Sequence, residues 1–218
     1  MNEILITGFE GYGGRSDNPS AAIAEALSGR EIAGHRLNTR VLPVTNHDIR
    51  ENITSLIDEL KPRAVLSLGL APGEKMIRIE RVAANYSHFE INDNSGQRYT
   101  GVIEKDGPQA YATTLPVEDM LAAVHECSIP AYLSNTAGTF LCNAVMYHAL
   151  HYCSEQNLDI ACGFVHLPYL PSQVCDLLTA TVKSSEVELH QRSDLASMSL
   201  EVQLAAVGAL LKRIIDGE

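Results

Sequence analysis

Cys142 stands where a thiol could act as a nucleophile. It follows a turn of small residues at 134–139 and lies one residue into a helix predicted from 141 to about 152. Apolar side chains recur in that segment at the spacing of one buried helix face: Leu141, Val145, Ala149 and Tyr152. Free N–H groups and the positive end of the dipole at a helix start stabilise a thiolate, so we expect a reactive cysteine. The alternative is a structural cysteine, because free cysteines are among the most buried residues.

Thiol catalysis also needs a base and a group that orients the base. Among eight histidines, His166 is the best candidate for the base, because it ends an apolar strand just before a proline-rich turn. Glu80 is a candidate for the orienting group, since it alternates out of phase with the aliphatic residues around it. The alternatives are a hydrogen-bonded histidine at a strand end and a solvated, salt-bridged face of Arg78, Glu80 and Arg81.

Two other patterns suggest different chemistry. The glycine-rich loop at 7–14 matches neither nucleotide-binding motif, and its two aromatic rings better suit a small, flat, neutral ligand. His148, His151 and Cys153 are close in sequence, as metal ligands often are. On a helix, however, Cys153 would point away from the two histidines, and no second ligand cluster is visible. We therefore expect no metal site and two solvated histidines on a helix flank.

The elements that must position these residues alternate between strand and helix. Strands are predicted at 4–7, 40–44, 64–70, 131–134 and 162–166, with an extended segment at 76–84 and no clear periodicity at 92–106. Helices are predicted at 19–27, 46–60, 116–127, 141–152, 171–183 and 195–215, and a surface connection at 184–194. This order indicates one α/β domain over 1–218, an α/β/α sandwich whose mostly parallel, twisted sheet is covered by helices on both faces.

In such folds, sites gather at the carboxyl ends of the strands. This rule places four segments near one edge of the sheet: the Phe9 loop, the residues after Leu70, the Gly138 turn and His166. Strand order cannot be derived from the local pattern. The edge is nevertheless the place where we expect the candidate nucleophile and base to meet.

Composition excludes several classes of function. The net charge of −11 disfavours nucleic acid and anionic membranes as partners, since both require clustered Lys and Arg. No apolar run is long enough to span a bilayer, and the first residues lack the basic region of a signal peptide. The five cysteines form no CxxC pair, so free thiols and a cytoplasmic location are expected.

Four motifs, in order, resemble the pyroglutamyl peptidase I family, the pyrrolidone-carboxylate peptidases, over nearly the whole chain. They are TGFEGYGG at 7–14 with the following NPS at 18–20, IERVAAN at 79–85, SNTAGTFLCNAVMY at 134–147 and GFVHLPYLPSQ at 163–173. The segment DGPQAYATTLP at 106–116 is also similar to family sequence. The resemblance implies a cytosolic cysteine peptidase without a cofactor. Such an enzyme removes an N-terminal 5-oxoproline from a small peptide with a blocked N-terminus and forms a homo-oligomer, a tetramer or a dimer.

The resemblance also implies residue roles. Cys142 matches the nucleophile, His166 the general base and Glu80 the residue that orients the base. Seven further positions match the substrate pocket, the first two flanking the oxoproline ring: Phe9, Tyr12, Thr45, Ile91, Phe140, Leu141 and Val145. The backbone N–H of Cys142 at the helix start would stabilise the oxyanion.

The chain departs from the family pattern at three places. Gly11 and Tyr12 stand where proline and phenylalanine are usual, and QRY at 97–99 replaces the usual NQP. Glu90 stands where an arginine close to the cysteine is usual, a reversal of charge that would raise the pKa of the thiol. One alternative is therefore a catalytically weak relative that binds 5-oxoproline or pyroglutamyl peptides without efficient turnover. A nucleoside-phosphorylase-like enzyme also fits the fold class, but the chain lacks a convincing phosphate site.

Overall fold

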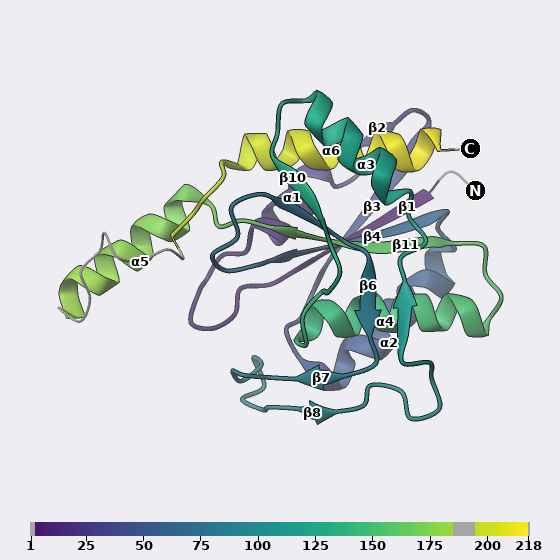
Figure 1. Ribbon diagram of the computed structural model, residues 1–218, viewed down its shortest axis with the longest axis horizontal. Helices are drawn as coiled ribbons and strands as arrows, with labels where there is room; N and C mark the ends of the chain where they lie inside the picture. Colours follow the sequence, from purple (N-terminus) through teal and green to yellow (C-terminus); the bar gives the residue numbers. More distant parts are fainter. Residues whose placement is uncertain (1–2, 185–194, 218) are drawn as a thin grey trace.

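A seven-stranded sheet forms the centre of the molecule (Figure 1), in a computed structural model that describes residues 3–184 and 195–217. In sheet order the strands are β10 (Ala131–Ser134), β5 (Ile77–Glu80), β11 (Ala161–Leu167), β4 (Ala64–Leu70), β1 (Glu3–Phe9), β3 (His35–Leu42) and β2 (Glu31–Ile32). Neighbouring strands are parallel except in the pairs β5–β11 and β2–β3. The predicted α/β class with a mostly parallel sheet is confirmed. That 1–218 forms one domain stays a prediction.

Helices cover both faces of this sheet (Figure 1). One face packs against α1 (Pro19–Leu27), α3 (Val117–Glu126) and α6 (Leu200–Asp216), and the other against α2 (Asn46–Leu60) and α4 (Leu141–Glu155). The side chains of β1 show why two cores form: Ile4 and Ile6 enter the first, whereas Leu5 enters the second. Successive strand residues point to opposite faces, so an apolar run fills both layers. The remaining helix, α5 (Pro171–Ser184), extends away from the sheet (Figure 1).

Two small antiparallel pairs lie beside α4. β6 (Val82–Ala84) pairs with β9 (Ala110–Ala112), and β7 (Ser87–His88) pairs with β8 (Thr100–Gly101). α4 contacts β6, β9 and β7, so these pairs cover the helix that carries Cys142. The segment predicted as one extended stretch at 76–84 is therefore two strands, β5 and β6, which belong to different sheets.

Two predicted boundaries were wrong. β3 begins at His35 rather than at residue 40, because Ala33 and Gly34 adopt left-handed φ values of 46° and 76° and turn the chain back into the β2–β3 hairpin. α6 begins at Leu200 rather than at residue 195, since the Ser199 hydroxyl caps the helix by accepting from the N–H of Val202. Residues 185–194 of the predicted surface connection lie outside the described part of the chain.

The other predicted helices agree with the structure to within about one turn at each end. α1 begins as the sequence indicates, with Asn18 as the cap that accepts from the N–H of Ser20 and Pro19 in the first turn. Across residues 3–184 and 195–217, no helix combines the length and apolar character needed to cross a bilayer.

Candidate active site

Cys142 is the second residue of α4. The residue before the helix, Phe140, is extended and has no side-chain capping bond, so the first N–H groups of the helix face the site without a capping side chain. Asn143 ties this turn to β6: its Oδ1 accepts from the N–H of Ala84 at 2.8 Å, and its Nδ2 donates to the carbonyls of Ala84 and Tyr86 at 2.9 and 3.0 Å. Sequence reasoning did not single out Asn143, although it follows Cys142 directly in the motif.

His166 and Glu80 form a buried pair. His166 Nδ1 lies 2.7 Å from Glu80 Oε1, and the two residues are 3% and 0% exposed. The alternative in which Glu80 belongs to a solvated strand face is therefore wrong. Arg78 Nε donates to the same Oε1 at 2.6 Å, and this ion pair offsets part of the cost of burying the carboxylate.

Gly69 brings the thiol next to the strand of His166. The register of β4 and β11 places Gly69 opposite His166. A Cβ atom at Gly69 would lie 2.9 Å from Cys142 Sγ and 2.7 Å from Phe164 Cζ, so the thiol occupies the space that a side chain there would fill. The Phe164 ring lies 4.7 Å from the His166 ring, centroid to centroid. Cys142 and His166 thus both adjoin Gly69, near the carboxyl ends of β4 and β11.

Burial sets the charge state of both groups. It raises the pKa of the Cys142 thiol to about 12; Glu80 adds to the rise and Arg78 opposes it. Burial also lowers the pKa of His166, against the opposing effect of the hydrogen bond that His166 donates to Glu80. The thiol and the imidazole are therefore both neutral at pH 7, because burial outweighs the thiolate stabilisation expected at a helix start. Glu90 is exposed and is not among the groups that shift the pKa of Cys142.

A small hollow with aromatic walls adjoins the thiol. It encloses a cavity of only about 10 Å³ and is lined by Phe9, Tyr12, Asn18, Val44, Leu70, Phe140, Leu141 and Cys142. The Tyr12 and Phe140 rings lie 5.9 Å apart, and Phe89 packs behind Phe140 at 4.4 Å, centroid to centroid. Four of the predicted pocket residues therefore line the hollow, together with Asn18, Val44 and Leu70, which sequence reasoning did not include.

The other three predicted pocket residues lie outside this wall. Thr45 precedes α2 and its hydroxyl donates to Asp48 at 3.1 Å. Ile91 is 43% exposed. Val145 is fully buried in the core beneath α4. The structure does not bring these three side chains to the hollow.

The two histidines predicted to be solvated are buried instead. His148 Nδ1 lies 3.3 Å from Glu104 Oε1, and His151 Nδ1 is 2.9 Å from the Tyr111 hydroxyl. The prediction failed because β9 and the segment around Glu104 cover this flank of α4, a contact that helical spacing does not reveal. Within the described residues, no three His, Cys, Asp or Glu side chains are grouped so as to hold a metal ion.

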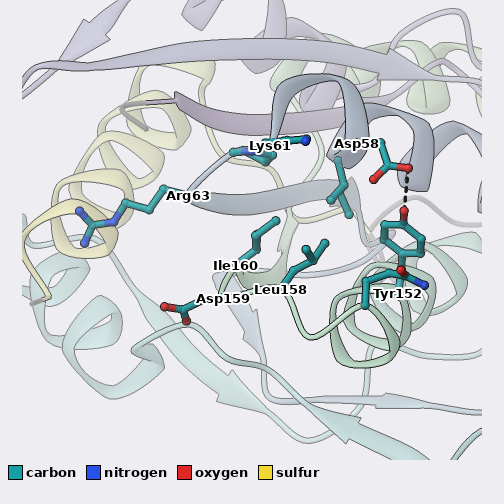
Figure 2. A pocket seen from close by; sticks show the side chains of 10 residues that line it. Asp58, Lys61, Arg63, Tyr152, Leu158, Asp159 and Ile160 are labelled. Atoms are coloured by element: carbon teal, nitrogen blue, oxygen red, sulfur yellow. Dashed lines mark hydrogen bonds between the residues drawn. The ribbon is translucent and has the colours of Figure 1, made fainter.

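A larger cavity lies at the opposite edge of the sheet (Figure 2). It is lined by the segments that lead into β4 and β11, including Lys61, Arg63 and Asp159, and Asp58 there accepts a hydrogen bond from Tyr152 at 2.6 Å. None of the described residues that line it is a cysteine or histidine. The chemistry therefore points to the smaller hollow beside Cys142.

The fold and these groups place the protein in the class of α/β proteins whose candidate site combines a cysteine with a buried histidine–carboxylate pair. The model of the pyroglutamyl peptidase family matches residues 2–215. The chain belongs to the pyroglutamyl peptidase family.

Relatives of known name agree with this assignment. The chain is 41% identical to the pyrrolidone-carboxylate peptidase of Pyrococcus furiosus over 80% of this chain and 84% of the relative. It is 42% identical to that of Enterobacter sp. (strain 638) over 89% and 96%. The solved structure of the pyrrolidone carboxyl peptidase of Thermococcus litoralis superimposes with a TM-score of 0.89 at 36% identity, covering 99% and 94% of the two chains.

Proposed function

We propose that this protein is a cysteine peptidase that removes an N-terminal 5-oxoproline (pyroglutamyl) residue from peptides. The observation that carries the proposal is the grouping of Cys142 and the His166–Glu80 pair beside the hollow with aromatic walls. Relatives named pyrrolidone-carboxylate peptidases support the same reaction. They also favour turnover over the alternative of a protein that only binds.

Cys142 is the nucleophile and His166 the general base. Because both groups are neutral before attack, the imidazole takes the thiol proton as Sγ adds to the pyroglutamyl carbonyl. The imidazolium then protonates the leaving amine, and the neutral imidazole activates the water that hydrolyses the thioester. Glu80 accepts from the Nδ1–H of His166, which keeps Nε2 free as the proton acceptor. The Cys142 N–H at the start of α4 stabilises the oxyanion.

The hollow matches the chemistry of the substrate. A 5-oxoproline ring is flat and uncharged, and it would lie among Phe9, Tyr12 and Phe140 once these side chains move apart to admit it, because the hollow encloses only about 10 Å³. Among the described residues that line the hollow there is no Asp, Glu, Lys or Arg. An ordinary N-terminal ammonium would therefore lose its hydration without gaining a charged partner, which selects for the blocked N-terminus. Thr45, Ile91 and Val145 would act behind or beside this wall rather than on the ring.

Hydrolysis of a pyroglutamyl arylamide tests the proposal. We expect the wild type to release the arylamine, and Cys142→Ala and His166→Ala each to lose at least about a thousandfold in kcat. Cys127→Ala, which alters an exposed cysteine away from the site, serves as the matched control and should retain activity. Binding of the arylamide by the wild type without release would instead support the alternative of a non-catalytic relative. A prolyl arylamide, which carries an ammonium group, should react at least about a hundredfold more slowly.

The resemblance to the family further supports a cytoplasmic enzyme that works without a cofactor as a homodimer or homotetramer. The five free cysteines, of which Cys127 and Cys175 are exposed, suit a reducing compartment. Light scattering coupled to size-exclusion chromatography would measure the mass of the assembly. A mass equal to one 23.7 kDa chain at micromolar concentration would contradict the oligomer.

A further inference from the structure

Arg78 contacts both members of the buried histidine–carboxylate pair. Its Nε donates to Glu80 Oε1 at 2.6 Å, and its Nη2 lies 3.1 Å from His166 Nδ1. The backbone explains this position. β5 and β11 are antiparallel, and their register places Arg78 directly opposite His166, while Glu80 follows two residues later on the same side of β5. The arginine is thus placed by the pairing of the sheet.

A second carboxylate holds the far side of the guanidinium. Arg78 Nη1 lies 3.5 Å from Glu74 Oε2, and that oxygen accepts from the Tyr132 hydroxyl at 2.8 Å. Tyr132 stands opposite Arg78 in the register of β10 and β5. The Arg78 side chain is only 22% exposed. This network orients the arginine toward the pair and prevents it from swinging into solvent.

The contact with His166 has an electrostatic consequence. When Nδ1 carries the proton that it donates to Glu80, the Arg78 Nη2–H and the Nδ1–H are two donors 3.1 Å apart. A positive charge there disfavours a second positive charge on the imidazole. Arg78 therefore lowers the pKa of His166, whereas Glu80 and Glu74 raise it. Tyr132 and Cys142 are further titratable groups in this part of the site, and Arg78 acts to lower the pKa of both.

We propose that Arg78 is a positioning residue for the catalytic pair, which orients the Glu80 carboxylate and keeps the His166 imidazole neutral so that it can accept the thiol proton in mildly acidic solution. The proposal rests on the function proposed above, because it concerns the base of that reaction. Without Arg78, burial would still lower the pKa of His166, but nothing in this network would oppose the effect of Glu80 and Glu74. A larger fraction of the imidazole would then be protonated in mildly acidic solution, and imidazolium cannot act as the base.

Two substitutions with opposite expected effects test the role. Arg78→Met removes the positive charge but keeps a side chain of similar length. The acid limb of the pH profile of kcat/KM should therefore move to higher pH, and kcat/KM at a pH on that limb should fall about tenfold for each pH unit of the shift. Glu74→Gln removes the carboxylate that opposes Arg78, so the limb should move to lower pH. Arg78→Lys keeps the positive charge, so its acid limb should lie close to that of the wild type, whereas its kcat should stay below the wild-type value. Arg81→Met alters the exposed arginine of the same segment and should leave the profile unchanged.

The rate at which iodoacetamide alkylates Cys142 should be measured over the same pH range, since this readout needs no peptide substrate. Shifts in alkylation with no arylamide hydrolysis by the wild type would leave the role of Arg78 standing and overturn the proposed function. Normal hydrolysis with superimposable profiles for wild type, Arg78→Met and Glu74→Gln would overturn the role of Arg78 alone. If Arg78→Met does not fold, two results still decide the question: a shift of the acid limb to lower pH in Glu74→Gln, and an acid limb close to that of the wild type with a reduced kcat in Arg78→Lys. Shifts of the same sign in both variants would indicate general loosening and contradict the proposal.

Discussion

At the scale of single residues, the side chains of the candidate site are packed closely around the carboxylate of Glu80. Glu80 Oε1 receives both Arg78 and His166, whereas Glu80 Oε2 is buried and has no hydrogen-bond partner within the described residues. A buried charge with one unpaired oxygen costs free energy, and removing a partner would cost more. The arrangement therefore adds little to the stability of the fold, in keeping with the proposed role of Glu80 in orienting His166.

Gly69 shows how tightly the thiol is held. In Gly69→Ala the new Cβ would lie 2.9 Å from Cys142 Sγ and 2.7 Å from Phe164 Cζ, so the thiol or the ring must move. Since misplacement of a reacting atom by about 1 Å can cost about a hundredfold, we expect kcat/KM to fall by about ten- to a hundredfold. The kinetics of pyroglutamyl arylamide hydrolysis measure this loss.

Gly208→Ala is the control for that substitution. Its Cβ would meet nothing within 4 Å on α6, so it should keep full activity and gain about 0.5 kcal/mol or more in helix stability. If Gly69→Ala keeps wild-type activity, the position of the Cys142 thiol does not depend on the lack of a side chain at residue 69.

At the scale of elements, the position of Cys142 depends on how firmly the first turn of α4 is held. The Asn143 amide supplies three hydrogen bonds that fasten this turn to Ala84 and Tyr86. Asn143 is fully buried, so these bonds are made away from water. Asn143 thus joins the first turn of α4 to the backbone after β5, and these bonds fix the direction in which the Cys142 side chain leaves the helix.

Replacing Asn143 tests this connection. Asn143→Ala would leave the buried N–H of Ala84 without an acceptor, so we expect the free energy of unfolding to fall by about 2–4 kcal/mol. Urea denaturation measures the loss, and the arylamide assay should show a parallel loss of kcat. Ser154→Ala, at an exposed position of the same helix, should change stability by less than about 0.5 kcal/mol. Equal stability of the two variants would contradict the anchoring role.

The elements also show where local patterns fail. Regular alternation and helix caps predicted α1, α2, β4 and α4 because each is decided by residues near in sequence. The early start of β3 follows from the β2–β3 hairpin, whose turn was not recognised in the sequence. The division of 76–84 into β5 and β6 depends on pairing with distant strands. Local periodicity carries no information about such partners.

At the scale of the whole molecule, buried histidines couple stability to pH. Burial, with Arg50 and His151, lowers the pKa of His148 from 6.5 to about 4 despite the nearby Glu104. The unfolded chain therefore takes up a proton near pH 6.5, whereas the folded chain resists until about pH 4. Stability contributed by the neutral form is fully present above pH 6.5 and is lost as pH falls toward 4.

Over that window we expect His148 to account for a loss of roughly 3 kcal/mol, and His166, whose pKa is also lowered, to act in the same direction. Urea denaturation at pH 7.5, 5.5 and 4.5 measures the slope. His148→Gln should flatten it. His47→Gln, at a histidine whose side chain is 66% exposed, should not. An unchanged slope in His148→Gln would exclude the coupling.

The sequence by itself determined the alternation of strands and helices, the edge at which the site forms, and the candidates Cys142, His166 and Glu80, because short-range periodicity and motif spacing encode them. It also indicated four of the residues that line the hollow. The sequence did not point to Gly69 or Asn143, and it placed Arg78 only on a possible solvated strand face, since each acts through a contact with a residue that is distant in sequence.

Only the tertiary structure decided that β5 inserts antiparallel to β11, between β11 and β10. This pairing buries Glu80, sets Arg78 opposite His166 and turns a strand that looked half solvated into part of the candidate site. The physical reason is that strand order is fixed by long-range hydrogen bonding and packing across the sheet. No local pattern in the chain records that order.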